Sequence, residues 1–125
     1  MSAACSPAIR TGTASGLLVI DIDPRNSGAI DRALMTPTAA VATGGGWHLY
    51  CRHPGTPTRT ALPGRAGVEI KSDAGYVTAP PSIHPGTGRP YRWTRRRAVS
   101  EMAPALAAAL TPPPAAGSRP LSAAL

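Results

Sequence analysis

The sequence predicts an α/β (α+β) fold, in which a small, mainly antiparallel sheet is accompanied by a few flanking helices. Three observations support this class: short apolar or alternating segments recur along the chain, turn-forming residues separate them, and only two segments are helix-prone. The 15 prolines and 13 glycines of this 125-residue chain favour turns over long regular elements. We predict one domain over residues 9–110, between a flexible N-terminus at 1–8 and a disordered Pro/Ala-rich tail at 111–125.

The expected strands are bounded by Gly, Pro, Asp and Ser residues and lie, in chain order, at 16–23, 39–43, 47–52, 67–71, 76–79 and 91–93. The second and third of these form a hairpin, because the triple glycine 44–46 provides a tight reversal between them. A short helix is expected over 28–35, capped by Asn26 or Ser27. A second is expected within 98–110, where Pro104 restricts it to one side.

Basic residues exceed acidic ones by 13 to six, giving a net charge of +7. This charge favours a polyanionic partner, with nucleic acid first and an acidic membrane surface second. A GC-rich coding sequence would produce the same bias, and Lys71 is the only lysine. Two widely spaced cysteines argue against a disulfide framework. With no apolar run near the roughly 20 residues of a membrane span and no signal peptide, we expect a cytoplasmic protein without a membrane partner.

The most informative segment is Gly16–Pro24, a continuous apolar run that ends in Asp21 and Asp23. Side chains alternate along a strand, so the two carboxylates point to one face while Ile20 and Ile22 point into a core. Two neighbouring carboxylates repel each other and lose water, and a divalent cation with a preference for oxygen ligands relieves both costs. Equally, the pair could be turn caps before Pro24.

Two further strands add polar groups that the same face can present, His48 and Glu69. Three carboxylates can hold Mg²⁺ or Mn²⁺ with open positions for phosphate oxygens, and a histidine can contact a polyphosphate. The glycines before His48, Gly45 and Gly46 among them, let backbone amides approach phosphates closely.

Six motifs in this order resemble the bifunctional DNA primase/polymerase domain of the archaeo-eukaryotic primase superfamily, found in replication proteins of plasmids, phages and mobile elements. They are Arg10-Thr11-Gly12, Gly16–Pro24, Thr43–Tyr50, Gly67–Lys71, Gly75–Pro85 and Tyr91–Trp93, and they cover residues 9–94. Each motif alone is weak, whereas the ordered series is specific. The resemblance implies an RRM-like sheet and template-directed attack of a 3′-hydroxyl on the α-phosphate of a nucleotide, with release of pyrophosphate.

The resemblance also assigns roles to individual residues. Asp21, Asp23 and Glu69 match the catalytic metal ligands, for which Mg²⁺ or Mn²⁺ is implied. His48 matches the histidine that contacts the phosphates of the incoming (deoxy)nucleoside triphosphate. Nucleotide binding or its structural support is implied for motif residues Arg10, Gly45, Gly46, Ser82 and His84.

Two departures from the family pattern stand out. The third acid is usually aspartate, and Glu69 carries one more methylene. Family domains normally begin with a further helical and strand region before the Arg-Thr-Gly motif, so we expect an N-terminally truncated or stand-alone version. A helicase partner would then be encoded separately.

Other polar residues near these motifs are candidates for contacts with substrate. Tyr50 shares the face of His48 and could contact a base or sugar, and Lys71 could contact the nucleotide or be a solvated residue. The basic run Arg92, Arg95, Arg96 and Arg97 is predicted to contact phosphates of a single-stranded DNA template or primer. Trp47 and Trp93 are interpreted as core residues because large apolar side chains are few.

Three functions remain open on the sequence. The leading one is a DNA primase/polymerase-type nucleotidyltransferase with two-metal chemistry. The second is a truncated, non-catalytic module that binds nucleic acid or nucleotide. The third is a fragment of a glycosyltransferase, in which an Asp-x-Asp pair binds a sugar nucleotide.

Overall fold

Seven short strands and one α-helix make up the regular structure of residues 7–113, the part of the chain that this computed structural model describes. The strands are β1 (Ala8–Thr11), β2 (Leu17–Ile22), β3 (Ala40–Ala42), β4 (Trp47–Arg52), β5 (Val68–Lys71), β6 (Gly75–Thr78) and β7 (Arg92–Arg95). A 3-10 helix, η2, spans Pro24–Asn26, and the helix α1 spans Pro104–Leu110. The mainly antiparallel α+β class is therefore confirmed.

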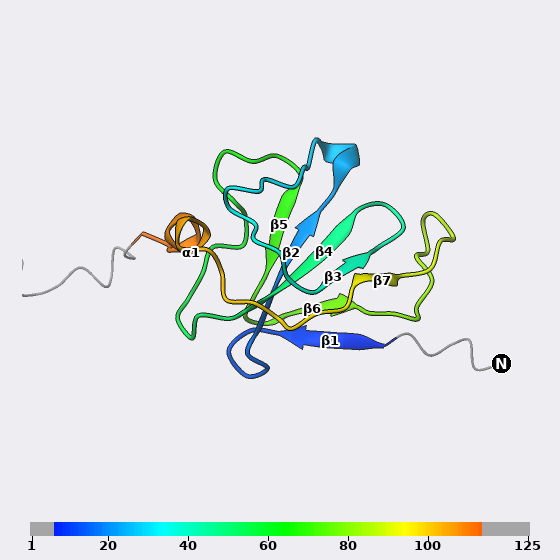
Figure 1. The fold of residues 1–125 in the computed structure, drawn as a ribbon, viewed down its shortest axis with the longest axis horizontal. Coiled ribbons are helices and arrows are strands. Elements are labelled where there is room, and N and C mark those ends of the chain that lie inside the picture. Colours follow the sequence, from blue (N-terminus) through cyan, green and yellow to red (C-terminus); the bar gives the residue numbers. More distant parts are fainter. Residues whose placement is uncertain (1–6, 114–125) are drawn as a thin grey trace, which may run out of the picture.

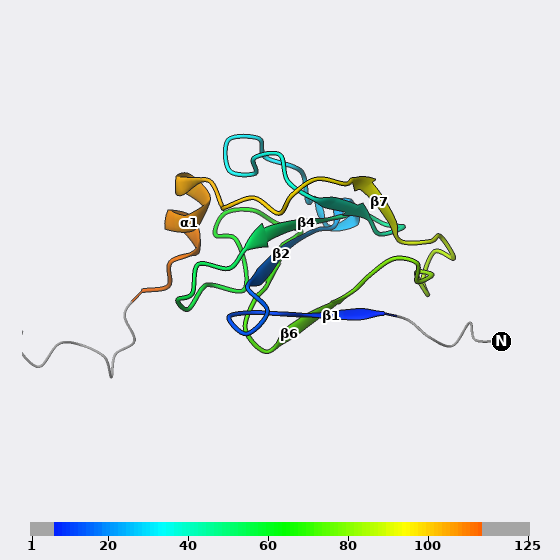
Figure 2. The ribbon, with the colours of Figure 1, turned by 60° about the horizontal axis from the view of Figure 1, so that its bottom comes forward.

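Five of the strands form the main sheet, in the order β5-β2-β4-β3-β7, with every pair antiparallel. The predicted hairpin across the triple glycine is present as β3 and β4. The remaining strands, β1 and β6, pair with each other in a separate ribbon. Figures 1 and 2 show this ribbon beneath one face of the main sheet, with α1 toward the other side.

The strand alternation explains these layers. On one face of β2 the side chains of Leu18, Ile20 and Ile22 are buried with Leu106 and Leu110 of α1. On the other face Val19 is fully buried with Tyr50 of β4 and Val77 of β6. Because apolar side chains leave water on both faces, each covering element stabilises the sheet by removing that surface from solvent. The predicted core position of Ile20 and Ile22 is confirmed.

No helix forms over 28–35, where one was expected, and this prediction was wrong. Asp31 accepts hydrogen bonds at its carboxylate from the backbone N–H of Ala33 and at its carbonyl from those of Leu34 and Met35. The result is a single turn, because a side-chain acceptor competes with continued helical bonding. Gly28 also packs against backbone, with space so tight that an added Cβ would lie 2.3 Å from the carbonyl oxygen of Gly67.

Only one strand of the β1–β6 ribbon, β6, was predicted from the sequence. Residues 1–8 were predicted to be a flexible N-terminus and no strand was expected before residue 16, yet Ala8 to Thr11 is a strand in register with Thr78 to Gly75. β6 follows β5 through the predicted turn but leaves the main sheet to pair with β1. The predicted flexible residues 1–6 and tail residues 114–125 lie outside the described range. Within that range no helix is long and apolar enough to cross a membrane.

Candidate functional site

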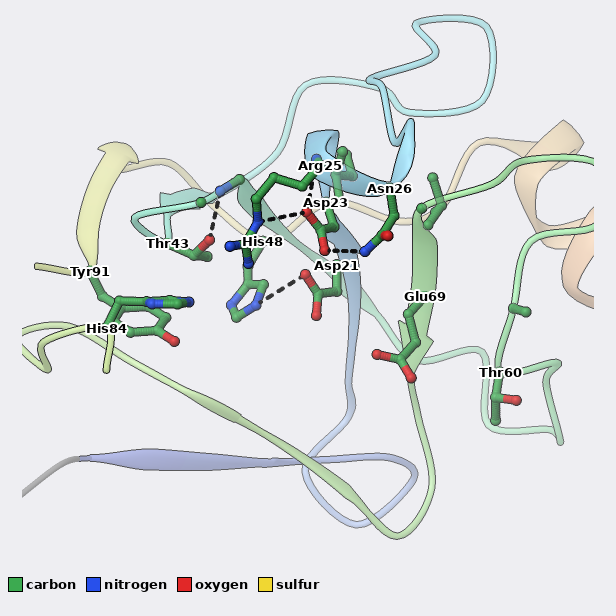
Figure 3. Close-up of a pocket in the computed structure, with 16 residues that line it drawn as sticks. Asp21, Asp23, Arg25, Asn26, Thr43, His48, Thr60, Glu69, His84 and Tyr91 are labelled. Atoms are coloured by element: carbon green, nitrogen blue, oxygen red, sulfur yellow. Dashed lines mark hydrogen bonds and ion pairs between the residues drawn. The ribbon is translucent and has the colours of Figure 1, made fainter. Parts of the chain in front are cut away.

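Three polar side chains form a row across the neighbouring strands β5, β2 and β4 of the main sheet. Asp21 of β2 is the register partner of His48 in β4 and of Glu69 in β5. These residues line a cavity of about 550 Å³, which Asp23 also lines, and we call it the acid cavity. Figure 3 shows Asp21 at its centre, with His48 on one side and Glu69 on the other. The structure therefore brings together the four residues that the sequence placed on one face.

Asp21 and His48 are the closest of these neighbours. An Oδ1 oxygen of Asp21 lies 3.6 Å from Nε2 of His48. The His48 side chain is 8% exposed, against 30% for Asp21, so the carboxylate is the wetter partner. Nδ1 of His48 is buried and has no hydrogen-bond partner within residues 7–113. An unpaired buried polar atom of this kind carries a desolvation cost.

Asp23 has a structural task as well as a place in the cavity. It caps η2, accepting hydrogen bonds from the backbone N–H of Arg25 at 3.0 Å and from Nδ2 of Asn26 at 2.7 Å. Nε of Arg25 also lies 3.7 Å from its Oδ1. The turn-cap interpretation of Asp23 is thus correct, and the cap fixes a carboxylate at the mouth of the cavity. The Asp-Pro-x-Asn sequence contains the signal for this cap.

Glu69 is more exposed and is paired with Lys71 two residues along β5. Oε1 of Glu69 lies 2.9 Å from Nζ of Lys71, and the side chains are 61% and 31% exposed, respectively. Lys71 lines a second cavity of about 400 Å³ that shares Asp21 and His48 with the first. An exposed ion pair of this kind contributes little to stability, so Glu69 can exchange its partner for a ligand at small cost.

The donor set suits a hard divalent cation, since Asp21, Asp23 and Glu69 bring carboxylate oxygens to one cavity. Within the described residues, however, no three acidic, histidine or cysteine side chains already converge as a preformed metal-binding cluster. The cap on Asp23 and the ion pair of Glu69 account for this, because each turns a carboxylate toward a protein partner.

The turn between β3 and β4 forms one rim of the acid cavity through Gly45 and Gly46. An added Cβ on Gly46 would lie 2.0 Å from the carbonyl oxygen of Ile22, so only glycine lets the turn lie this close to the end of β2. The N–H of Gly46 donates to Oγ1 of Thr43 at 3.0 Å. This amide is therefore occupied within the turn, unlike the phosphate-binding amide that the sequence suggested.

His84 and Tyr91 form another wall of the acid cavity, and Figure 3 shows them stacked together. Their ring centroids are 5.9 Å apart with an interplanar angle of 26°, and Tyr91 also lies 6.1 Å from the His48 ring. Nδ1 of His84 accepts from the N–H groups of Gly86 and Thr87, so Nε2 carries the proton. The predicted residue His84 is thus a hydrogen-bond donor at this wall.

Tyr91 was not among the predicted site residues. Partial burial raises the pKa of its phenol, a hydrogen bond with Thr78 opposes the rise, and the charge of Asp21 adds to it. The phenol is therefore a neutral donor at physiological pH. Arg25, Asn26 and Thr43 line the cavity too and were also missed. The alternation of Tyr91 and Trp93 in the last strand motif was the signal that could have placed Tyr91 on this face.

Tyr50 does not line the acid cavity, so the predicted contact of this residue with a base or sugar is corrected. It is 2% exposed, lies in the core between the sheet and β6, and packs against Trp93 at 5.5 Å between ring centroids. Burial raises its pKa to about 12. Its position on the face of His48 was predicted correctly, but β6 covers that end of the face.

Two other predicted nucleotide contacts lie away from the acid cavity. Ser82 is 4% exposed, and its carbonyl oxygen accepts a hydrogen bond of 2.8 Å from the backbone N–H of Tyr91. Its place indicates structural support, the second of the roles considered for it. Arg10 is exposed on β1 beside its register partner Tyr76, on the ribbon and not among the residues lining the cavity.

The basic run is exposed along the edge of the main sheet. Arg92 and Arg95 bound β7, and Arg96 and Arg97 follow it. The register pairs Arg92 with Ala42 and Arg95 with Ala40, positions on the face of Trp47 and Leu49. Two of the four predicted arginines thus occupy the sheet face opposite the acids, and none lines the acid cavity.

Comparison with known proteins identifies a family that the chain matches. A family model described as bifunctional DNA primase/polymerase, N-terminal, matches residues 2–114. No curated protein and no solved structure matched the chain significantly. The family match removes the basis for the glycosyltransferase alternative. Since the match spans nearly the whole chain, the protein belongs to the bifunctional DNA primase/polymerase family.

Proposed function

We propose that the acid cavity is a nucleotidyl-transfer site that extends a DNA primer on a single-stranded template. The observation that carries the proposal is the row of Asp21, His48 and Glu69 across three strands, with Asp23 at the same cavity. Phosphoryl transfer requires acidic residues and phosphate-binding donors at one site, and side chains of both kinds line this cavity. Membership of the primase/polymerase family supports the choice of DNA and nucleotides as substrates.

Asp21, Asp23 and Glu69 are the residues that would hold Mg²⁺ or Mn²⁺. Such ions neutralise phosphate charge and activate the attacking hydroxyl when they are bound. Asp21 would contribute from the middle strand of the row, beside Glu69 on β5. Asp23 would keep its cap on η2 and offer its remaining lone pairs. Glu69 would leave Lys71, which its exposed position permits.

The incoming nucleotide would be held by donors on the walls of the cavity. His48 and His84 both line the cavity beside Tyr91, and Arg25 lines it beside Asp23. Two imidazoles and a guanidinium suit a triphosphate, because charge-assisted hydrogen bonds to phosphate oxygens are strong. Tyr91 offers an aromatic face and a neutral hydroxyl, and it replaces Tyr50 as the candidate for base or sugar contact.

A second function has its own support. Asp23 and Glu69 already have protein partners, and no preformed cluster of three metal-ligating side chains occurs in residues 7–113. A module that binds nucleotide or nucleic acid without turnover would have these properties. Metal dependence separates the two functions, because a catalytic site requires the ion whereas the basic surfaces do not.

Primer extension on a single-stranded DNA template, with deoxynucleotides and Mn²⁺, tests the proposed function. The double variant Asp21→Asn/Asp23→Asn should lose extension by about 100-fold or more, which corresponds to at least about 2.7 kcal/mol of transition-state stabilisation. Glu101→Gln is the matched control, because Glu101 is 83% exposed and pairs with Arg52 away from the cavity. Circular dichroism of each variant establishes that it is folded.

Extension that survives in the double variant would contradict the proposed roles of the aspartates. Absence of extension by folded wild-type protein that still binds nucleotide would favour the non-catalytic module.

A further inference from the structure

A basic groove lies on the face of the main sheet opposite the acids, at the β3–β7 edge. It consists of two cavities, of about 370 Å³ and about 200 Å³, which both include Trp47 in their lining. Arg89 and Arg92 line the larger, and Arg32 and Arg95 line the smaller. We call the two together the Trp47 groove. Trp47 is 36% exposed and Trp93 is 37% exposed, so the interpretation of both as core residues is corrected.

The strand register explains why these side chains meet. Ala42 is paired with Trp47 on one side and with Arg92 on the other, and Ala40 is paired with Leu49 and Arg95. Paired residues share a face, so the tryptophan and both arginines rise from the same surface. Between them the small alanine side chains leave a low floor. The helix α1 packs into the apolar cluster on this face, with residues of β2 and β5, and Figure 1 shows it at the side of the sheet away from β7.

The groove and the acid cavity border the same turn. Gly45 and Gly46 line both the acid cavity and the larger cavity of the groove. The turn between β3 and β4 is therefore a shared rim. A flexible chain lying along the Trp47 groove could cross this rim and deliver its end to Asp21.

The charges of the groove are of one sign. No aspartate or glutamate lines either of its cavities, and its four arginines have no ion-pair partner within residues 7–113. Unpaired guanidinium groups around an exposed indole suit a polyanion that also presents flat apolar surfaces. Single-stranded nucleic acid has both properties, whereas in a duplex the base faces are stacked away from side chains.

We propose that the Trp47 groove binds single-stranded nucleic acid, with one base stacked on Trp47 and the backbone along Arg92 and Arg95. Where the acid cavity performs nucleotidyl transfer, the bound strand is the template, and this assignment rests on the proposed function. Binding of the strand itself needs neither metal nor nucleotide.

The test is fluorescence anisotropy of a short labelled oligothymidine, with EDTA present and no nucleotide. Trp47→Ala should weaken binding about tenfold, within the range that stacking of one base contributes. Trp47→Phe keeps an aromatic face and should restore most of the affinity. Arg92→Gln/Arg95→Gln should lower the slope of log affinity against log salt by about 1.4, since each single-strand phosphate contact contributes about 0.7.

Arg52→Gln is the control, because Arg52 is exposed on the same strand as Trp47 but pairs with Glu101 at its other end. It should bind like wild-type protein. Unchanged affinity in both Trp47→Ala and the double arginine variant would overturn the proposal. So would tighter binding of duplex DNA, or displacement of the oligothymidine by polyglutamate at equal charge.

The outcomes separate this proposal from the function of the acid cavity. Normal extension together with normal strand binding by the groove variants would refute the groove alone. Groove-dependent strand binding without extension by wild-type protein would refute nucleotidyl transfer alone.

Discussion

His48 and Tyr50 lie two residues apart on one face of β4, and their surroundings differ. Tyr50 is buried with Val19, Val41 and Val77 where β6 covers the sheet. His48 is also largely buried, yet its ring lines the acid cavity and its Nδ1 has no partner within the described residues. One face of a sheet is therefore core at one end and candidate site at the other.

The comparison teaches what sets the boundary between core and site. Strand alternation assigns both residues to the same face, because it depends only on the pleat. Which part of the face is covered depends on the β1–β6 ribbon, whose strands pair across more than 60 positions of sequence, as Arg10 with Tyr76. The covered half stabilises the fold, and the open half is available for chemistry.

Adjacent residues of β2 should give the largest contrast between stability and activity. Ile20→Ala should lower the free energy of unfolding by about 2–5 kcal/mol, because Ile20 is fully buried and truncation leaves a cavity. Asp21→Asn should change it by less than about 1 kcal/mol, since the carboxylate is partly exposed, while extension is lost. Urea denaturation measures both values. Equal destabilisation by the two variants would show that Asp21 is structural.

The two glycines of the shared rim provide a second contrast. Gly46→Ala should destabilise the protein by about 1–3 kcal/mol and impair nucleotide binding, because its Cβ would collide with the Ile22 carbonyl oxygen. Gly45→Ala should be tolerated, since the nearest atom to its Cβ, beyond its chain neighbours, is Nη2 of Arg25 at 3.8 Å. Thermal denaturation and nucleotide titration compare the pair. Equal behaviour of both variants would contradict the close approach of this turn to β2.

A third contrast is between Tyr91 and Tyr50, the two tyrosines near His48. Tyr91→Ala should weaken nucleotide binding about tenfold, because a stacked base or sugar contact is lost from the cavity wall. Tyr50→Phe should leave the affinity within about twofold, because its hydroxyl is buried beneath β6. Isothermal titration with a nucleoside triphosphate and Mn²⁺ distinguishes them. A strong effect of Tyr50→Phe alone would restore Tyr50 to the site.

The last contrast concerns alkaline pH. Burial raises the pKa of Tyr50 from its ordinary 10.0 to about 12 in the folded protein. Its contribution to stability is therefore fully present below pH 10 and is lost as the pH rises through about 12, because the unfolded chain ionises first. Tyr50→Phe should remove this part of the alkaline loss. Identical pH dependence of unfolding in both proteins would place Tyr50 in a wetter environment.

Much of the candidate site could be predicted from local sequence. The apolar run before Asp21 fixed its face, and the triple glycine fixed the hairpin that puts His48 opposite it. Glu69 followed from alternation in the short segment 67–71. Each of these inferences depends on neighbours in sequence or on one turn.

The rest depends on distant contacts or on competition between weak preferences. The strand β1 is only four residues long and shows no alternation of apolar and polar residues. Its pairing with β6 therefore could not be predicted from Ala8–Thr11. The segment 28–35 has helical spacing, but Asp31 and the tight packing of Gly28 favour a turn instead. Trp47 was assigned to the core because large apolar side chains are few, yet it is 36% exposed, since the apolar cluster with α1 does not include it.

Binding of Mn²⁺ at the acid cavity tests the central claim most directly, because paramagnetic broadening locates an ion without any need for turnover. Amide resonances of nitrogen-15-labelled protein should broaden selectively around Asp21, Asp23 and Glu69 on addition of Mn²⁺ and nucleotide. The broadening should disappear in Asp21→Asn/Asp23→Asn and persist in Glu101→Gln. Broadening that is absent, or that centres on other carboxylates such as Glu101, would contradict the assignment of this cavity as the catalytic centre.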